Sequence, residues 1–105
     1  MEKNNLVRLN PIEFNQILKE LRESVLKYGD LEGRISVEAV RFTIKLHYYC
    51  QVYESGEIPF RTYEIYGICI DEIQVYSHRF DGINHDDWYA LEERANDMLK
   101  GKILR

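Results

Sequence analysis

The residues best suited to acid–base or metal chemistry gather near the carboxyl end of the chain. His78, His85, Asp86 and Asp87 lie in and beside the segment FDGINHDDW. Imidazole and carboxylate groups together could ligate a divalent ion or exchange protons with a substrate. Acidic residues are also common in the first turn of a helix, where they complement the helix dipole. We therefore expect helix capping here, and keep a metal-dependent or acid–base enzyme using residues 78–87 as the second alternative function.

Other signatures of catalysis do not occur in the sequence. It contains three histidines and no GxSxG, HExxH, GxGxxG or phosphate-binding glycine loop. The two cysteines, Cys50 and Cys69, lack the spacing of a zinc site. The sequence thus favours a non-enzymatic protein with no catalytic residue, cofactor or metal.

A second group of residues has the chemistry of a binding face. Apolar and polar residues alternate from Val40 to Tyr53, and further polar and aromatic residues follow the break ESGEIP. Successive side chains of a strand point to opposite faces, so the polar set shares one face. Tyrosine and arginine are enriched in protein interfaces. The predicted binding residues are Arg41, Lys45, His47, Tyr49, Tyr53, Arg61 and Tyr63.

The same tyrosines could stack on the bases of a single-stranded nucleic acid, which is the first alternative function. The charge of the chain argues against it. The net charge is -4, and acidic residues slightly outnumber basic ones between residues 34 and 80. We therefore expect a protein partner, with nucleic acid disfavoured because phosphates would meet no cationic field.

The elements that position these residues follow from hydrophobic spacing. Phe14, Ile17, Leu21 and Val25 recur at helical spacing after a capping signal at Asn10, and a second amphipathic pattern runs from about residue 86 to residue 100. Between the helices the period changes to two, which predicts three or four long antiparallel strands. Slips of this period near residue 39 and at residues 71–72 indicate bulges or strand breaks. Residues 1–8 show no period and are expected to be a loosely ordered lead-in.

A hairpin symmetric about Gly56 gives a trial register in which paired residue numbers sum to about 112. This register places Phe42 opposite Ile70, Ile44 opposite Ile68 and Leu46 opposite Tyr66. It also puts Arg41 opposite Asp71 and Gln51 opposite Arg61. Cys50 and Cys69 then fall on opposite faces of the sheet, so we expect free thiols and no disulfide.

The sequence as a whole predicts one α+β domain spanning residues 1–105. It has two layers: an antiparallel sheet of three to four long bulged strands, with an N-terminal and a C-terminal helix on one face. We expect a small protein-binding or self-associating module of accessory or inhibitory type, acting through the tyrosine-rich sheet face or a sheet edge. Homodimerisation is the favoured use, since a second copy would cover an exposed face or edge. No membrane span is apparent, and the expected compartment is the cytoplasm.

Overall fold

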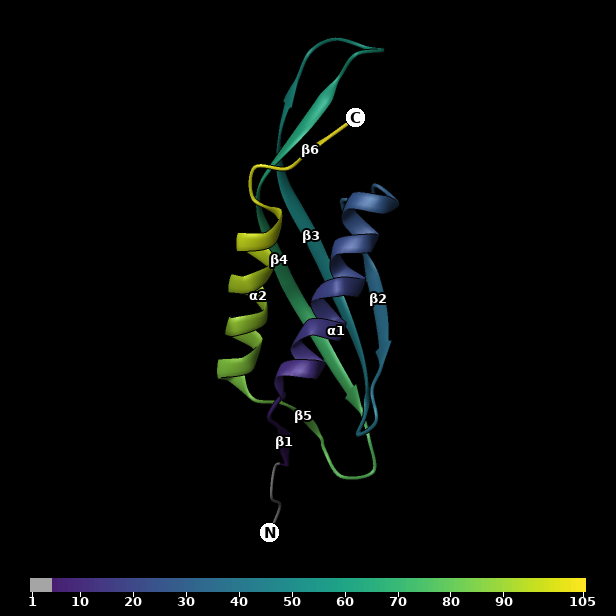
Figure 1. The fold of residues 1–105 in the computed structure, drawn as a ribbon, viewed down its shortest axis with the longest axis vertical. Helices are drawn as coiled ribbons and strands as arrows, with labels where there is room; N and C mark the ends of the chain where they lie inside the picture. Colours follow the sequence, from purple (N-terminus) through teal and green to yellow (C-terminus); the bar gives the residue numbers. More distant parts are fainter. Residues whose placement is uncertain (1–4) are drawn as a thin grey trace.

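The computed structural model describes residues 5–105, which form an α+β fold with the predicted architecture (Figure 1). A four-stranded antiparallel sheet has the order β2-β3-β4-β6, and a short parallel pair joins β1 to β5. One helix precedes the sheet strands in sequence and the other follows β5. In chain order the elements are β1 (Leu6–Val7), α1 (Pro11–Arg22), η1 (Glu23–Lys27), β2 (Glu32–Glu38), β3 (Thr43–Ser55), β4 (Thr62–Tyr76), β5 (Gly82–Ile83), α2 (His85–Leu99) and β6 (Ile103–Leu104).

The amino end of α1 carries the predicted capping box. The Asn10 side chain accepts a hydrogen bond from the Glu13 N–H at 2.8 Å, and the Glu13 carboxylate accepts one from the Asn10 N–H at 2.9 Å. These bonds satisfy two backbone donors that a helix start would otherwise leave unpaired. The helix continues through the π-helical turn η1, which the sequence pattern did not indicate. It stops before Gly29, whose φ of +72° suits glycine.

The lead-in begins to have regular structure at Leu6. Leu6 and Val7 form β1, which pairs with β5, and the Val7 side chain is fully buried. The expectation of a loose segment was therefore wrong for these residues, because one buried valine and a parallel partner hold them. Residues 1–4 lie outside the described part of the chain.

The trial register of the β3–β4 hairpin was wrong. Ser55 pairs with Thr62 next to the turn, and Thr43 pairs with Tyr76 at the far end. The loop is centred near Ile58 and Pro59 instead of Gly56, so neither Arg41–Asp71 nor Gln51–Arg61 is a pair. Two register shifts, between His47 and Tyr48 and between Gln51 and Val52 of β3, change the pairing partners again with distance from the turn.

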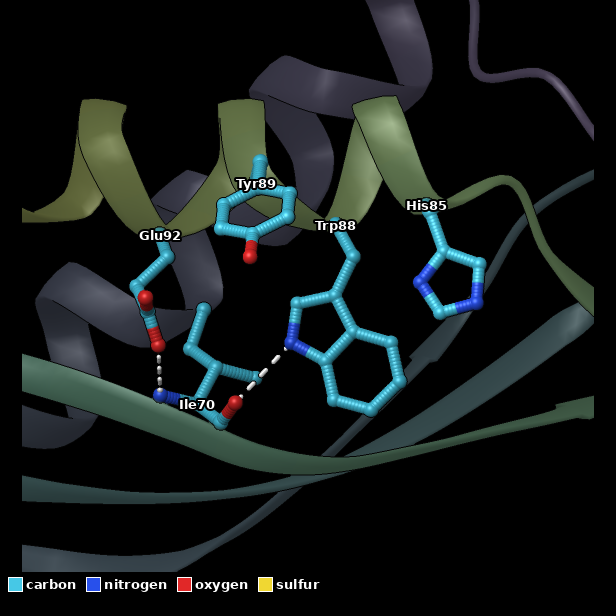
Figure 2. A pocket seen from close by; sticks show the side chains of 5 residues that line it. All are labelled: Ile70, His85, Trp88, Tyr89 and Glu92. Atoms are coloured by element: carbon cyan, nitrogen blue, oxygen red, sulfur yellow. Dashed lines mark hydrogen bonds between the residues drawn. The ribbon is translucent and has the colours of Figure 1, made fainter.

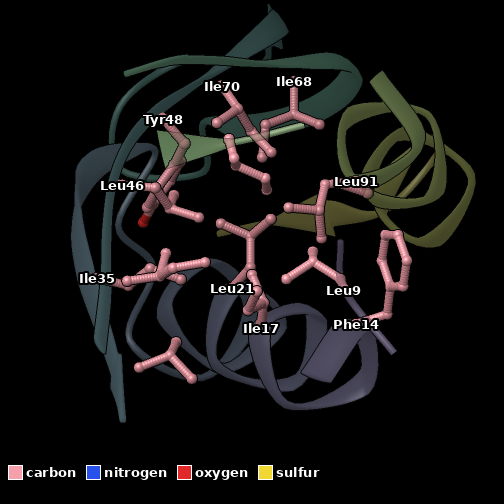
Figure 3. Packing of buried hydrophobic residues seen from close by; sticks show 14 of the residues in the cluster. Leu9, Phe14, Ile17, Leu21, Ile35, Leu46, Tyr48, Ile68, Ile70 and Leu91 are labelled. Atoms are coloured by element: carbon pink, nitrogen blue, oxygen red, sulfur yellow. The ribbon is translucent and has the colours of Figure 1, made fainter. Parts of the chain in front are cut away.

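The core lies between the sheet and the two helices (Figure 3). Seen along the molecule, the sheet curves around α1 and α2, with the labelled aliphatic side chains pointing into the space between them. Ile44, Leu46 and Tyr48 of β3 are fully buried against this layer. The Tyr48 hydroxyl is hydrogen-bonded to Ser24 Oγ at 2.6 Å and donates to the Asp30 carbonyl at 2.7 Å, so the buried polar atom is satisfied.

The β3–β4 hairpin extends beyond the helical layer and makes the molecule long, with extents of 57 × 21 × 20 Å (Figure 1). The two cysteines are free thiols, as expected, because Cys50 faces the helices and Cys69 faces away from them. No helix within residues 5–105 has the length and apolar character needed to cross a bilayer.

Candidate protein-binding surface

No element within residues 5–105 covers the sheet surface that faces away from the helices, and we call this surface the outer face. Strand β3 alternates without interruption, so its odd-numbered side chains all point to this side. Their cross-strand partners on β2 and β4 share the same face. The outer face comprises Glu32, Arg34, Ser36 and Glu38 of β2, Thr43, Lys45, His47, Tyr49, Gln51 and Tyr53 of β3, and Glu64, Tyr66, Gly67, Cys69, Asp71, Glu72, Gln74 and Tyr76 of β4.

Four tyrosines give the outer face its aromatic character. Tyr49, Tyr53, Tyr66 and Tyr76 expose between 38% and 61% of their surface. The rings of Tyr53 and Tyr66 stack with centroids 4.4 Å apart and planes at 30°. The Lys45 ammonium lies 5.3 Å from the centroid of the Tyr76 ring. These contacts hold large, amphipathic side chains in fixed positions on an open surface, which lowers the entropy cost of binding through them.

The two bulges of β4 decide which of its side chains reach the outer face. Tyr66 is the extra residue between Gly67, opposite Gln51, and Ile65, opposite Val52. Because of this insertion Tyr66 turns outward and stacks on Tyr53, whereas the trial register had placed it in the core. A Cβ on Gly67 would lie 2.5 Å from the Gln51 side chain, so glycine lets Gln51 cover the strand at this point.

The second bulge brings two consecutive carboxylates, Asp71 and Glu72, to the same face. Glu72 pairs with His47 in the ladder, and Asp71 is the extra residue. Adjacent strand residues normally point to opposite faces, so this arrangement exists only because of the bulge. The period slip predicted an irregularity at these residues, and that prediction is confirmed.

His47 sits between carboxylates from both neighbouring strands. Its Nδ1 lies 2.6 Å from Asp71 Oδ1, and its Nε2 lies 3.1 Å from Glu32 Oε2. The hydrogen bond to Asp71 is the main reason that the pKa of His47 is raised above its usual value; the nearby Arg34 acts in the opposite direction. Both carboxylates favour the imidazolium form, which can donate from both nitrogens at once. Arg34 in turn pairs with Glu72 at 3.0 Å.

Tyr49, two residues after His47 on β3, pairs with Cys69 of β4 and lies beside its thiol. The hydrogen bond to Cys69 is the main cause of the raised pKa of Tyr49. Cys50, on the helix-covered side, has its pKa raised to about 11 by burial. Burial is the sole cause of the Cys50 shift, so Cys50 does not have the cationic neighbour that activates a nucleophilic cysteine.

Of the seven predicted binding residues, Lys45, His47, Tyr49 and Tyr53 lie on the outer face. Arg41 does not, because it precedes β3 and binds Glu13 of α1 through two hydrogen bonds of 2.7 and 2.9 Å. Tyr63 pairs with Glu54 and lies on the helix side of the hairpin, where it lines a groove with Leu26 and Leu104.

Arg61, the remaining predicted residue, lies at the base of the hairpin loop, 3.7 Å from Glu54. Sequence reasoning missed Tyr66, Tyr76 and the carboxylates around His47. Only the period slips in β4 could have indicated that its side chains change face.

The residues 78–87 are not brought together into one site. Asp87 is buried and accepts a hydrogen bond from the Leu9 N–H at 2.8 Å, so it fastens the start of α1 to α2. Asn84 caps α2 by accepting from the Asp86 N–H at 2.9 Å. Among residues 5–105 no three histidine, cysteine or acidic side chains are placed to hold a metal ion.

A pocket of about 280 Å³ beside His85 lies between α2 and the edge of β4 (Figure 2). Its polar groups serve the backbone of Ile70: Glu92 accepts from the Ile70 N–H at 2.8 Å, and the Trp88 indole donates to the Ile70 carbonyl at 2.9 Å. Asn96 makes the same kind of contact with both backbone groups of Ile68, each at 3.0 Å. The helix therefore caps this strand edge through Trp88, Glu92 and Asn96, and these three side chains have a structural role.

Comparison with known proteins adds no relative. No protein-family model matches the sequence, and neither the curated proteins nor the solved structures contain a match.

Proposed function

We propose that the protein is a small non-enzymatic module of accessory or inhibitory type that binds another protein through its outer face. The observation that carries this proposal is the placement of Tyr49, Tyr53, Tyr66 and Tyr76 on one uncovered sheet face. The opposite face packs the core, so these rings are not needed for folding of the helix-covered layer. Large exposed aromatic surfaces framed by polar groups are typical of protein interaction sites.

The charges on the outer face support a protein partner over a nucleic acid. Glu32, Glu38, Glu64, Asp71 and Glu72 outnumber the permanent cations Arg34 and Lys45. Phosphate groups would be repelled by such a surface, whereas a basic or mixed protein surface would complement it. A partner that carries arginine or lysine beside an apolar patch fits both the carboxylates and the tyrosines.

Two further elements belong to this proposal. Self-association is an expected property of the module, because both the outer face and one sheet edge are open. We also propose that it acts in the cytoplasm, since two unpaired thiols suit a reducing compartment.

The proposal is tested with three immobilised baits: the wild type, Tyr53→Ala/Tyr66→Ala, and the control Tyr89→Ala. Tyr89 is 73% exposed but lies on α2, away from the outer face. We expect at least one protein from source-cell extract to be retained by the wild type and the control but lost from the double variant. Its purified form should then bind the double variant about tenfold or more weakly in calorimetry.

Two results would overturn the proposal. The first is a set of captured proteins that is identical for all three baits. The second is tight binding of a labelled single-stranded oligonucleotide, measured by fluorescence anisotropy, that falls steeply with salt and disappears in Tyr53→Ala/Tyr66→Ala.

A further inference from the structure

Strand β2 leaves one edge of the sheet open. In the described part of the chain it pairs only with β3, and the pairing is regular along its whole length. The Ala39 N–H donates to the Phe42 carbonyl at 2.8 Å, and the Leu31 carbonyl accepts from the Cys50 N–H at 2.7 Å. Odd-numbered backbone groups thus point toward β3. By the alternation of an antiparallel ladder, the N–H and C=O groups of Glu32, Arg34, Ser36 and Glu38 point away from the sheet.

This edge contrasts with the opposite one. Side chains of α2 cap the backbone of Ile68 and Ile70, and β6 pairs with Tyr63 and Glu64. Within residues 5–105 no hydrogen bond of this kind reaches the outward backbone groups of β2. The strand has no proline or bulge, which are common ways of blocking an edge. Among the residues that the structure describes, the edge is protected only by the charged side chains of Glu32, Arg34 and Glu38.

Those charges are complementary to a second copy of the same strand. We infer that two copies pair antiparallel along β2 about a twofold axis at Ser36. In this register Arg34 of each copy lies opposite Glu38 of the other, and Ser36 lies opposite Ser36 of the second copy. The backbone N–H and C=O groups of the even-numbered β2 residues, which point away from the sheet, would then form hydrogen bonds with the same groups of the second copy, as an antiparallel ladder requires.

Other registers fit less well. An axis at Ile35 places Glu32 opposite Glu38 twice, and an axis at Arg34 places that cation opposite itself; like charges directly opposite each other are destabilising. An axis at Gly33 pairs Arg34 with Glu32, but only residues 32–34 of the strand overlap.

The helix side of the edge is compatible with the same axis. Ile35 of one copy lies opposite Val37 of the other, and both side chains point toward the core layer, where they are 8% and 4% exposed. A groove of about 250 Å³ runs between this part of β2 and the helical segment. It is lined by Glu20 of α1, Glu23 and Ser24 of η1, the exposed Tyr28 just after η1, and Arg34, Ile35 and Ser36 of the strand. The paired sheets would form one continuous layer whose two outer faces join.

A charge-exchange experiment tests the pairing. Arg34→Glu makes residues 34 and 38 both acidic, and Glu38→Arg makes them both basic. In each variant alone, the two charge pairs across the axis are therefore repulsive. We expect a wild-type dimer in sedimentation equilibrium and at least about tenfold weaker self-association in each variant. An equimolar mixture of the two should dimerise again, because acidic and basic edges then face each other. The control Glu64→Arg, on the outer face but far from β2, should dimerise as the wild type does.

Three results would overturn the inference: a wild type that stays monomeric at about 200 µM, a dimer unaffected by both edge variants, or a mixture that remains monomeric although both variants are folded by circular dichroism. Amide exchange gives a second readout. Dimerisation through this register should slow exchange of the Arg34, Ser36 and Glu38 amides as concentration rises, and leave Ile35 and Val37 unchanged because β3 already bonds them. Tyr53→Ala/Tyr66→Ala leaves Arg34 and Glu38 in place, so it should keep this dimer while losing the partner, and the two proposals can fail separately.

Discussion

Replacing Arg41 by alanine is expected to destabilise the fold without touching the outer face. The Arg41 guanidinium donates to both oxygens of the Glu13 carboxylate, at 2.7 and 2.9 Å, and also to the Arg8 carbonyl at 2.7 Å. It therefore ties the loop between β2 and β3 to the start of α1. The Glu13 side chain is 5% exposed and the Arg41 side chain 39% exposed. Removing the cation leaves a nearly buried carboxylate without its charged partner.

The size of the effect follows from this geometry. Each hydrogen bond to a charged group contributes about 1.5–3 kcal/mol, and breaking a fully buried ion pair costs about 3–5 kcal/mol. Water can reach the site from the exposed arginine side, so we expect the lower end, about 2–3 kcal/mol. For a domain of this size that corresponds to a fall in Tm of about 10 °C or more.

The measurement is urea unfolding followed by circular dichroism, with Arg61→Ala as the control. Arg61 lies 3.7 Å from Glu54, and both side chains are well exposed, at 40% and 56%. An exposed pair of this kind contributes about 0–1 kcal/mol, so the control should unfold close to the wild type. Equal stabilities of Arg41→Ala and Arg61→Ala would refute the reasoning.

The pH dependence adds an independent check. The hydrogen bond from Arg41 is the main cause of the lowered pKa of Glu13. A depressed pKa in the folded state contributes stability above the unfolded value of about 4.5, and that stability is lost as pH falls through the folded pKa. The difference in free energy of unfolding between the wild type and Arg41→Ala should therefore be largest at pH 7 and become smaller at strongly acidic pH. A gap that is the same at pH 7 and pH 3 would contradict the assigned role of Glu13.

Two further predictions concern the sheet. The raised pKa of His47 means that its contacts with carboxylates stabilise the folded state fully below the unfolded pKa of about 6.5. This stabilisation is lost as pH rises through the folded pKa. In urea unfolding, the stability difference between the wild type and His47→Gln should thus be larger at pH 6 than at pH 9; an equal difference would argue against the cluster. Tyr48→Phe should cost about 1–3 kcal/mol, because a fully buried hydroxyl and its two hydrogen bonds are removed. The control Tyr53→Phe, 61% exposed, should be neutral in the same assay, and matching losses in both would count against this account.

Local sequence signals were sufficient for the positions of the two α-helices and for the faces of β3, but not for the π-helical turn η1. Asn10, Pro11 and Glu13 predict the start of α1 through bonds made within one turn, and the structure shows those bonds. Strict alternation from Phe42 to Tyr53 predicts which β3 side chains are buried, because a strand of period two has no other way to bury its apolar residues. Lys45, His47, Tyr49 and Tyr53 were placed on the outer face for that reason.

The position of β4 against β3 was decided by tertiary structure. Gly56 suggested a tight turn, but the loop runs on through Arg61, and two bulges then change the pairing along the hairpin. A bulge depends on both strands and on the layer that covers them, so no local pattern fixes which residue is the extra one. This is why Tyr63 was assigned to the wrong face and why Tyr66 was missed.

The sequence by itself determined the two amphipathic helices, the long strands between them and a polar face on β3, because each of these rests on contacts between near neighbours in the chain. Only the tertiary structure brought Asp71 and Glu32 to His47, tied Arg41 to Glu13 and left β2 as the open edge. These features join residues that are 15 to 28 positions apart or depend on what covers a strand. Their geometry is set when the sheet curves around the helices, since packing then fixes which bulge, pair and edge can coexist.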